Sequence, residues 1–161
     1  MEKGMCYWLK VYEIPEGGRL ARGRAIVNLI ELDKDDAIKA FVPVKTLEDE
    51  EYINEHSIIM ATKDGQVKKT TLEAYSRPRR DGIIAINIKE DEIVDMVVIK
   101  NTHEATVLAM SENGYGKRSL VDDYREQSRG GKGVITLKIT PKTGDLIALK
   151  EVTDHDDLMI I

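Results

Sequence analysis

The sequence has 161 residues, of which 42% are hydrophobic and 33% charged, and its formal net charge is −5. This content suffices for one globular domain with a buried core and excludes wholesale disorder. The single cysteine, Cys6, excludes an intramolecular disulfide, and the lack of a signal peptide or an apolar span predicts a cytoplasmic protein without membrane association.

Three units of the chain align with one another, a pattern typical of propellers and other repeat arrays. Each unit has a glycine at a turn and a second glycine 17 or 19 residues later. The pairs are Gly4 and Gly23, Gly65 and Gly82, and Gly114 and Gly133. The approximate units are residues 1–47, 56–99 and 103–152 of a single domain that covers 1–161.

Each unit shows the same succession of apolar runs. In the second unit, the run Ile58–Ala61 leads to an Asp-Gly turn of the hairpin type, and a second strand follows. After a loop come alternating apolar residues at 84, 86 and 88 and a last run over 93–99. The pattern predicts an all-β protein of four-stranded units, with single helical turns over 70–75 and 119–124. Such repeats favour a propeller-like arrangement of about three blades.

The two ends of the sequence are complementary parts of a unit. Within residues 155–161, the run Leu158–Ile161 is interpreted as the opening strand of a further or ring-closing blade. Met1 stands at the turn of a unit that has no opening strand. We therefore expect the tail to complete the first unit, either within one chain or between two chains of a homodimer. A fragment or an engineered, shortened domain is the alternative.

Basic residues gather in the same loop of all three units, between acidic stretches. On radial blades these loops fall on one rim, so they predict a positive belt for a polyanion despite the negative total charge. The loop cations are Arg19, Arg22 and Arg24; Arg77, Arg79 and Arg80; and Arg129 and Lys132. The adjacent pairs after the hairpin turns are Lys68 with Lys69 and Lys117 with Arg118, of which one member each is expected to face the partner.

The third of these loops carries a recognisable motif. Its sequence Gln127-Ser128-Arg129-Gly130-Gly131-Lys132-Gly133 resembles the box Q-R-R-G-G-K-G of the DNA gyrase A subunit's C-terminal domain, with Ser128 in place of an arginine. Further similarity lies in residues 7–15, 21–29, 67–70 and 113–118. The resemblance implies a β-pinwheel, in which neighbouring blades exchange a strand, with duplex DNA wrapped around its basic perimeter. In that family the box belongs to the first blade, whereas here it lies in the third unit.

The motif has a physical interpretation. Gly130, Gly131 and Gly133 permit a close approach of the backbone to a phosphate, Arg129 and Lys132 supply charge, and Gln127 can anchor the loop. The alternative is a tight connection between blades in which the glycines only satisfy geometry. Phosphate contacts carry no base information, so binding is expected to be independent of sequence.

The sequence contains no constellation for catalysis, no metal cluster and no cofactor motif, so we expect no catalytic residues, metal or cofactor. The resemblance implies a non-catalytic part of an ATP-dependent type IIA topoisomerase, which supports DNA supercoiling at the nucleoid together with gyrase B and the rest of the gyrase A subunit. Two alternatives remain: the related domain of topoisomerase IV, from its own A subunit, and a protein-interaction propeller without DNA binding, marked by an exposed apolar patch.

Overall fold

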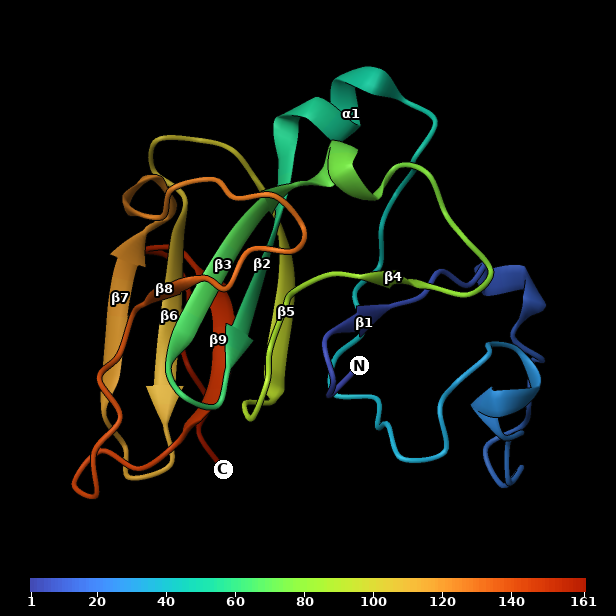
Figure 1. Cartoon of the computed structure of the whole chain (residues 1–161), viewed down its shortest axis with the longest axis horizontal. Helices are drawn as coiled ribbons and strands as arrows, with labels where there is room; N and C mark the ends of the chain where they lie inside the picture. The colour runs from blue at the N-terminus through green and yellow to red at the C-terminus, as the bar shows by residue number, and fades with distance from the viewer.

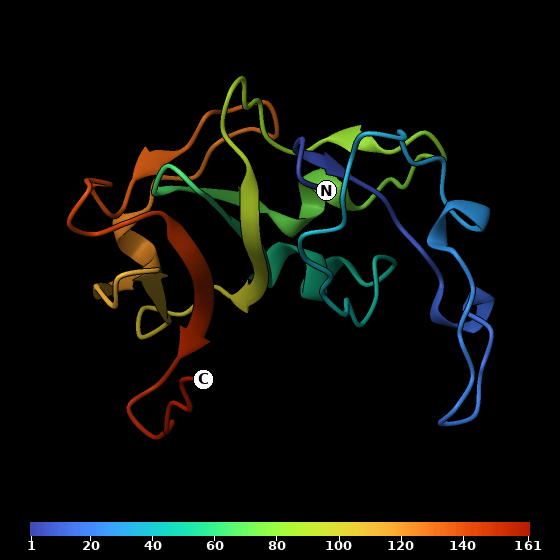
Figure 2. The same ribbon diagram turned by 90° about the horizontal axis from the view of Figure 1, so that it is seen from below.

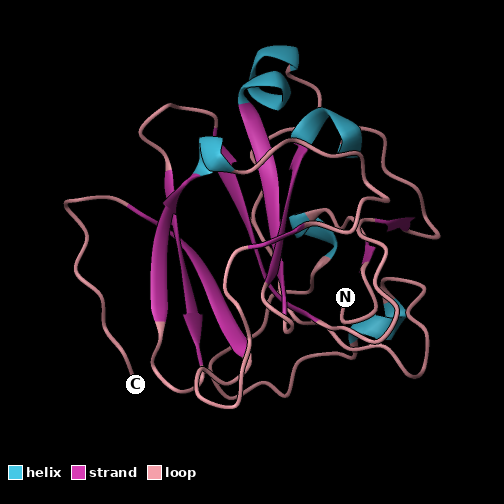
Figure 3. Ribbon diagram, turned by 60° about the vertical axis from the view of Figure 1, so that its left-hand side comes forward, coloured by secondary structure: helices cyan, strands magenta, loops and turns pink.

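The structure is a computed structural model that describes residues 1–161 (Figure 1). The prediction of an all-β propeller-like fold is confirmed, because sheets dominate and helices are limited to one short helix and single 3₁₀ turns (Figure 3). The strands are β1 (Met5–Cys6), β2 (His56–Thr62), β3 (Gln66–Thr71), β4 (Ile83–Ile84), β5 (Ile93–Lys100), β6 (Thr106–Ser111), β7 (Gly116–Leu120), β8 (Val134–Ile135) and β9 (Leu146–Val152). The helical elements are α1 (Glu50–Glu55), η1 (Val11–Glu13), η2 (Ile26–Asn28), η3 (Leu72–Tyr75) and η4 (Val121–Asp123).

The strands form three antiparallel sheets, one for each unit. The middle sheet has the order β5-β2-β3-β8, the sheet of the third unit β7-β6-β9, and the sheet of the first unit β1-β4. The hairpins β2-β3 and β6-β7 turn at Gly65 and Gly114, whose φ angles of 78° and 80° only glycine adopts without strain.

Neighbouring units exchange a strand. β4 belongs to the second unit but pairs with β1 of the first, and β8 belongs to the third unit but pairs with β3 of the second. The exchange explains why only the middle sheet has four strands: three come from its own unit and the fourth from the next unit. The pinwheel exchange implied by the family resemblance is therefore present.

The middle sheet is buried on both faces. Along β2, Ile59 and Ala61 enter a core shared with the third unit, whereas Ile58 and Met60 enter a core shared with the first. Successive side chains of a strand point to opposite faces, so one strand serves two cores. Full burial of one such aliphatic side chain stabilises a fold by roughly 1.5–3 kcal/mol, so the middle sheet stabilises its contacts with both neighbouring units.

The single helical turns lie where the sequence places them, as η3 and η4. Helix α1 was not expected. Its signal is Asp49, whose carboxylate accepts hydrogen bonds from the backbone N–H of Glu51 at 3.0 Å and of Tyr52 at 3.2 Å. Ile53 then anchors the helix in the core. No helix has the length and apolar character to cross a bilayer.

Two segments differ from the predicted strands. The first unit forms only the two-residue strand β1, and the tail Leu158–Ile161 is exposed and forms no strand. An extended segment needs a neighbour for its backbone N–H and C=O groups. In this structure the tail ends on the side of β9, away from the first unit, so the two ends do not complete one blade within the chain (Figure 2).

Candidate nucleic-acid interface

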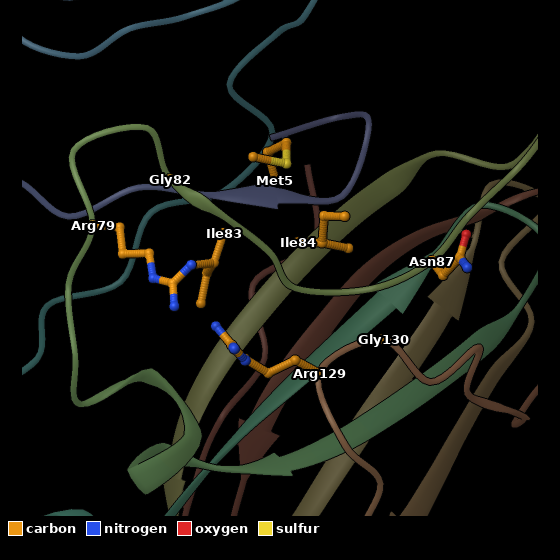
Figure 4. A pocket seen from close by; sticks show the side chains of 8 residues that line it. All are labelled: Met5, Arg79, Gly82, Ile83, Ile84, Asn87, Arg129 and Gly130. Atoms are coloured by element: carbon orange, nitrogen blue, oxygen red, sulfur yellow. The ribbon is translucent and has the colours of Figure 1, made fainter.

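A hollow of about 460 Å³ lies where the basic loops of the second and third units meet (Figure 4). Arg79 enters it from one loop and Arg129 from the other, and Figure 4 shows their guanidinium groups directed toward one another. The remaining lining residues are Met5, Gly82, Ile83, Ile84, Asn87 and Gly130. No carboxylate lines this hollow, and neither arginine forms an ion pair, so both charges are available to an anion.

Short contacts hold the glycine-rich loop in place. The backbone N–H of Gln127 donates to the carbonyl of Lys69 at 2.9 Å, and the Gln127 Oε1 accepts from the N–H of Gly133 at 3.3 Å. The expected anchoring role of Gln127 is therefore present. Gly133 has a φ of 98°, and a Cβ there would lie 3.0 Å from the carbonyl oxygen of Val67. These contacts place Arg129 at the hollow without fixing its side chain.

The pair Lys68 and Lys69 was expected to place one member on the rim, but both side chains are buried in this structure. Lys68 lies under the glycine-rich loop. Its side chain is fully buried, and its ammonium group donates to the backbone carbonyls of Ala85, Ser128 and Arg129, the second of these at 3.1 Å. Lys68 therefore has no surface to offer a phosphate in this structure. It fastens the glycine-rich loop of the third unit to the second unit, because its three hydrogens are directed at carbonyls of both.

The same lysine adds positive charge beneath the hollow. Burial, and second the nearby guanidinium of Arg129, lower the pKa of Lys68 to about 8. The ammonium is nevertheless protonated at neutral pH, and its three carbonyl partners favour the charged form. A phosphate above the loop would contact Arg79 and Arg129 directly. The charge of the buried Lys68 ammonium beneath the loop would also attract it.

The lowered pKa of Lys68 gives a test by pH. Between pH 8 and the ordinary lysine value of 10.5, the unfolded chain holds this proton and the folded chain releases it. Stability from this group therefore rises with pH across that window. In urea unfolding at pH 7, 8, 9 and 10, the free energy of unfolding of the wild type is expected to rise relative to that of Lys68→Met. Parallel pH curves would refute the burial of a charged Lys68.

The other predicted cations fall into two groups. Three are engaged in ion pairs: Lys69 with Asp122 at 3.9 Å, Arg80 with Glu31 at 3.1 Å and Arg118 with Asp154 at 2.5 Å. Surface pairs contribute about 0–1 kcal/mol, so a phosphate can replace the carboxylate at Arg80 and Arg118. The exposed cations without an ion pair are Arg19, Arg22, Arg24, Arg77, Lys117 and Lys132. The loop of the first unit does not reach the hollow.

Asn87 lines the hollow but was not among the predicted residues. Its position in the repeat is occupied by Asn28 in the first unit and Lys138 in the third. A polar side chain therefore stands in an otherwise apolar strand pattern in every unit, and this is the signal that could have identified it. Its amide group can donate a hydrogen bond to a phosphate oxygen.

Comparisons with known proteins point in one direction. The family model described as DNA gyrase C-terminal domain, beta-propeller, matches residues 2–45, 56–100 and 105–153. The gyrase A subunits of Salmonella typhimurium and Staphylococcus epidermidis are each 33% identical over 210 residues, with 99% of this chain and 23% of the relative covered. That of Clostridium acetobutylicum is 35% identical over 208 residues, with 99% and 24% covered. The chain thus spans about a quarter of the length of these relatives.

Solved structures show the same fold. A structure of the DNA gyrase A C-terminal domain superposes with a TM-score of 0.74 at 20% identity, covering 95% of this chain and 46% of that chain. The structure of the E. coli ParC C-terminal domain superposes with a TM-score of 0.67 at 18% identity, covering 94% and 59%.

Proposed function

Because this chain belongs to the DNA gyrase C-terminal domain family, we propose that it binds duplex DNA without regard to sequence and bends it along its basic loops. On this proposal it is a non-catalytic part of a type IIA topoisomerase in the cytoplasm, at the nucleoid. Its partners are duplex DNA, gyrase B and the rest of the gyrase A subunit. Its contribution to ATP-driven supercoiling is to hold the bent DNA.

The observation that carries the proposal is the convergence of Arg79 and Arg129 on one hollow. Two guanidinium groups that face one another repel, and no carboxylate of the hollow relieves this repulsion. A phosphate between them would relieve it and would accept hydrogen bonds from both forks. The arginines come from successive units, so a duplex that contacts both lies across the boundary between two blades.

Several contacts must act together for DNA to bend. Bending 20–30 base pairs by 40–90° costs of order 1–10 kcal/mol, depending on sequence. The exposed loop cations Arg77, Lys132 and Arg19 are without ion pairs and lie in the equivalent loops of the three units. Contacts of this kind are made to phosphates, so they supply affinity and bending without reading bases.

The test is a fluorescence-anisotropy titration of two unrelated duplexes of ~40 base pairs, long enough for a bend of this size. We expect similar dissociation constants for both, of roughly 10⁻⁴ to 10⁻⁶ M at physiological salt. The logarithm of the binding constant should fall linearly with the logarithm of salt concentration, by about 0.9 for each phosphate contacted. A strong preference for one sequence, or binding that does not respond to salt, would contradict the proposal.

A further inference from the structure

The hollow between the basic loops has an apolar side as well as a charged one. Ile84 lines it and is 60% exposed, although the residues on either side of it in the chain are buried. Met5 lies directly opposite Ile84 in the pairing of β1 with β4, so the two side chains are directed to the same face of this sheet. Figure 4 shows both of them at the hollow that Arg79 and Arg129 enter. The site thus combines two guanidinium groups with an aliphatic surface.

The same arrangement recurs one unit further along the chain. Ile135 is 73% exposed and is the second residue after Gly133. Ile84 has the same place after Gly82. Ile135 also follows a basic loop, whose exposed Lys132 stands three residues before it. A single apolar residue on a surface is ordinary. Two isoleucines at one repeat position, each directly after a basic loop, indicate a shared contact.

Phosphate contacts alone do not account for an aliphatic side chain at this place. A phosphate oxygen accepts hydrogen bonds from guanidinium groups, whereas a methyl group offers it neither a donor nor a charge. Covering aliphatic surface is favourable when other apolar surface takes the place of water. In a DNA backbone, the apolar surface next to each phosphate is the C–H face of the deoxyribose. A duplex held by the two arginines therefore brings a sugar toward Ile84.

The other apolar surfaces of a duplex fit this site less well. Thymine methyl groups lie inside the major groove, and the faces of the bases are reached only when the stack is opened by a wedge. Ile84 lines a wall of the hollow, whereas a wedge has to project into the duplex. Contact with a sugar is the same for every base, which agrees with binding that does not depend on sequence.

We propose that Ile84 packs against the deoxyribose next to the phosphate that Arg79 and Arg129 hold, and that Ile135 makes the same contact in the following unit. This contact rests on the proposed function and adds to it a contribution to affinity that is not ionic. Ionic contacts weaken as salt rises, because the release of counterions drives them. Burial of apolar surface has no such dependence. The protein is therefore expected to prefer DNA to a polyanion that has phosphates but no sugars.

Two substitutions of nearly equal shape separate the apolar contact from the fold. Ile84→Val and Ile84→Thr both keep a β-branched side chain, which suits a strand, and they differ in one methyl group that a hydroxyl replaces. Ile147→Thr is the matched control, because Ile147 lies in β9, is 55% exposed and is not part of the hollow. The double variant Ile84→Thr/Ile135→Thr tests the repeated contact. Exposed positions tolerate such changes with little loss of stability.

Affinity is measured for two polyanions. A duplex of ~40 base pairs is titrated by fluorescence anisotropy at four salt concentrations, and inorganic polyphosphate is titrated by calorimetry. We expect Ile84→Thr to bind the duplex about 5- to 10-fold more weakly at every salt concentration, with an unchanged salt slope, and Ile84→Val at most about 2-fold more weakly. The double variant should lose more than Ile84→Thr. Ile147→Thr should match the wild type, and all variants should bind polyphosphate equally well.

Equal DNA binding by Ile84→Val and Ile84→Thr would overturn the sugar contact while leaving the proposed DNA binding intact. A loss of polyphosphate affinity as large as the loss of DNA affinity would do the same, because Ile84 would then act through the shape of the basic loops. So would a shallower salt slope for Ile84→Thr, which would indicate a lost phosphate contact. A wild type that fails to bind the duplex at low salt would overturn the proposed function and the sugar contact together.

Discussion

The double variant Arg129→Ala/Lys132→Ala is expected to bind duplex DNA about 10- to 100-fold more weakly than the wild type at low salt, because it loses two phosphate contacts. The slope of the logarithm of affinity against the logarithm of salt should become shallower by about 2. Anisotropy titrations at four salt concentrations measure both quantities. Arg129 is the more telling residue, because it is directed at Arg79 across the hollow.

A matched variant separates local contacts from total charge. Lys34→Ala/Lys45→Ala removes the same two charges from exposed lysines outside the basic loops. We expect it to retain nearly the affinity and salt slope of the wild type, because distant charges are screened beyond about 10 Å at 0.1 M salt. If both double variants lose the same affinity, the loops have no special role and the proposed DNA interface is wrong.

Gly65→Ala is expected to destabilise the fold by about 3 kcal/mol or more, whereas Gly114→Ala should cost only about 1–2 kcal/mol. Both residues have a φ near 80°, so an alanine suffers the same backbone strain at either position. They differ in surroundings: only at Gly65 would the new methyl group collide with the exchanged strand, at the carbonyl oxygen of Leu137. The difference between the two variants therefore measures the strand exchange itself.

Urea unfolding at low protein concentration gives the two free energies. A lower midpoint with an unchanged m-value would show a loss of stability rather than a change in compactness. Equal destabilisation by Gly65→Ala and Gly114→Ala would mean that only backbone strain lowers the stability. The contact between Gly65 and the exchanged strand would then contribute nothing to it.

Much of the fold could be predicted from the sequence because the repeat carries it. Turn glycines at equivalent positions and alternating apolar residues determine hairpins and faces, and these are local properties of the chain. The pairing partner of the third strand of a unit is not a local property of the chain, because it depends on packing between blades. The exchange of β4 and β8 was expected only from the resemblance of residues 127–133 to a known box. Helix α1 was missed because its acidic residues looked like a solvated loop.

The candidate site was predictable in composition but less so in geometry. The charge pattern identified the loops that carry Arg79 and Arg129, and the structure brings these two together. The sequence could not show that Lys68 lies under the loop rather than on the rim. Alternation along a strand determines the face to which a side chain points, but not which segment covers that face. Nor could the sequence show that Arg80 pairs with Glu31, a contact between two units.

The strand exchange also sets an order for biosynthesis. The first and second units each receive their outer strand from the unit that follows, so a ribosome that makes the chain from its N-terminus releases both of these units before their sheets are complete. The edge of β3 stays open until Val134 and Ile135 have left the exit tunnel, although its hairpin partner was complete long before. Interrupting the chain within the third unit, before β8, would leave the sheet of the second unit without its last strand. A defect in the first unit would not remove a strand from the sheets of the later units.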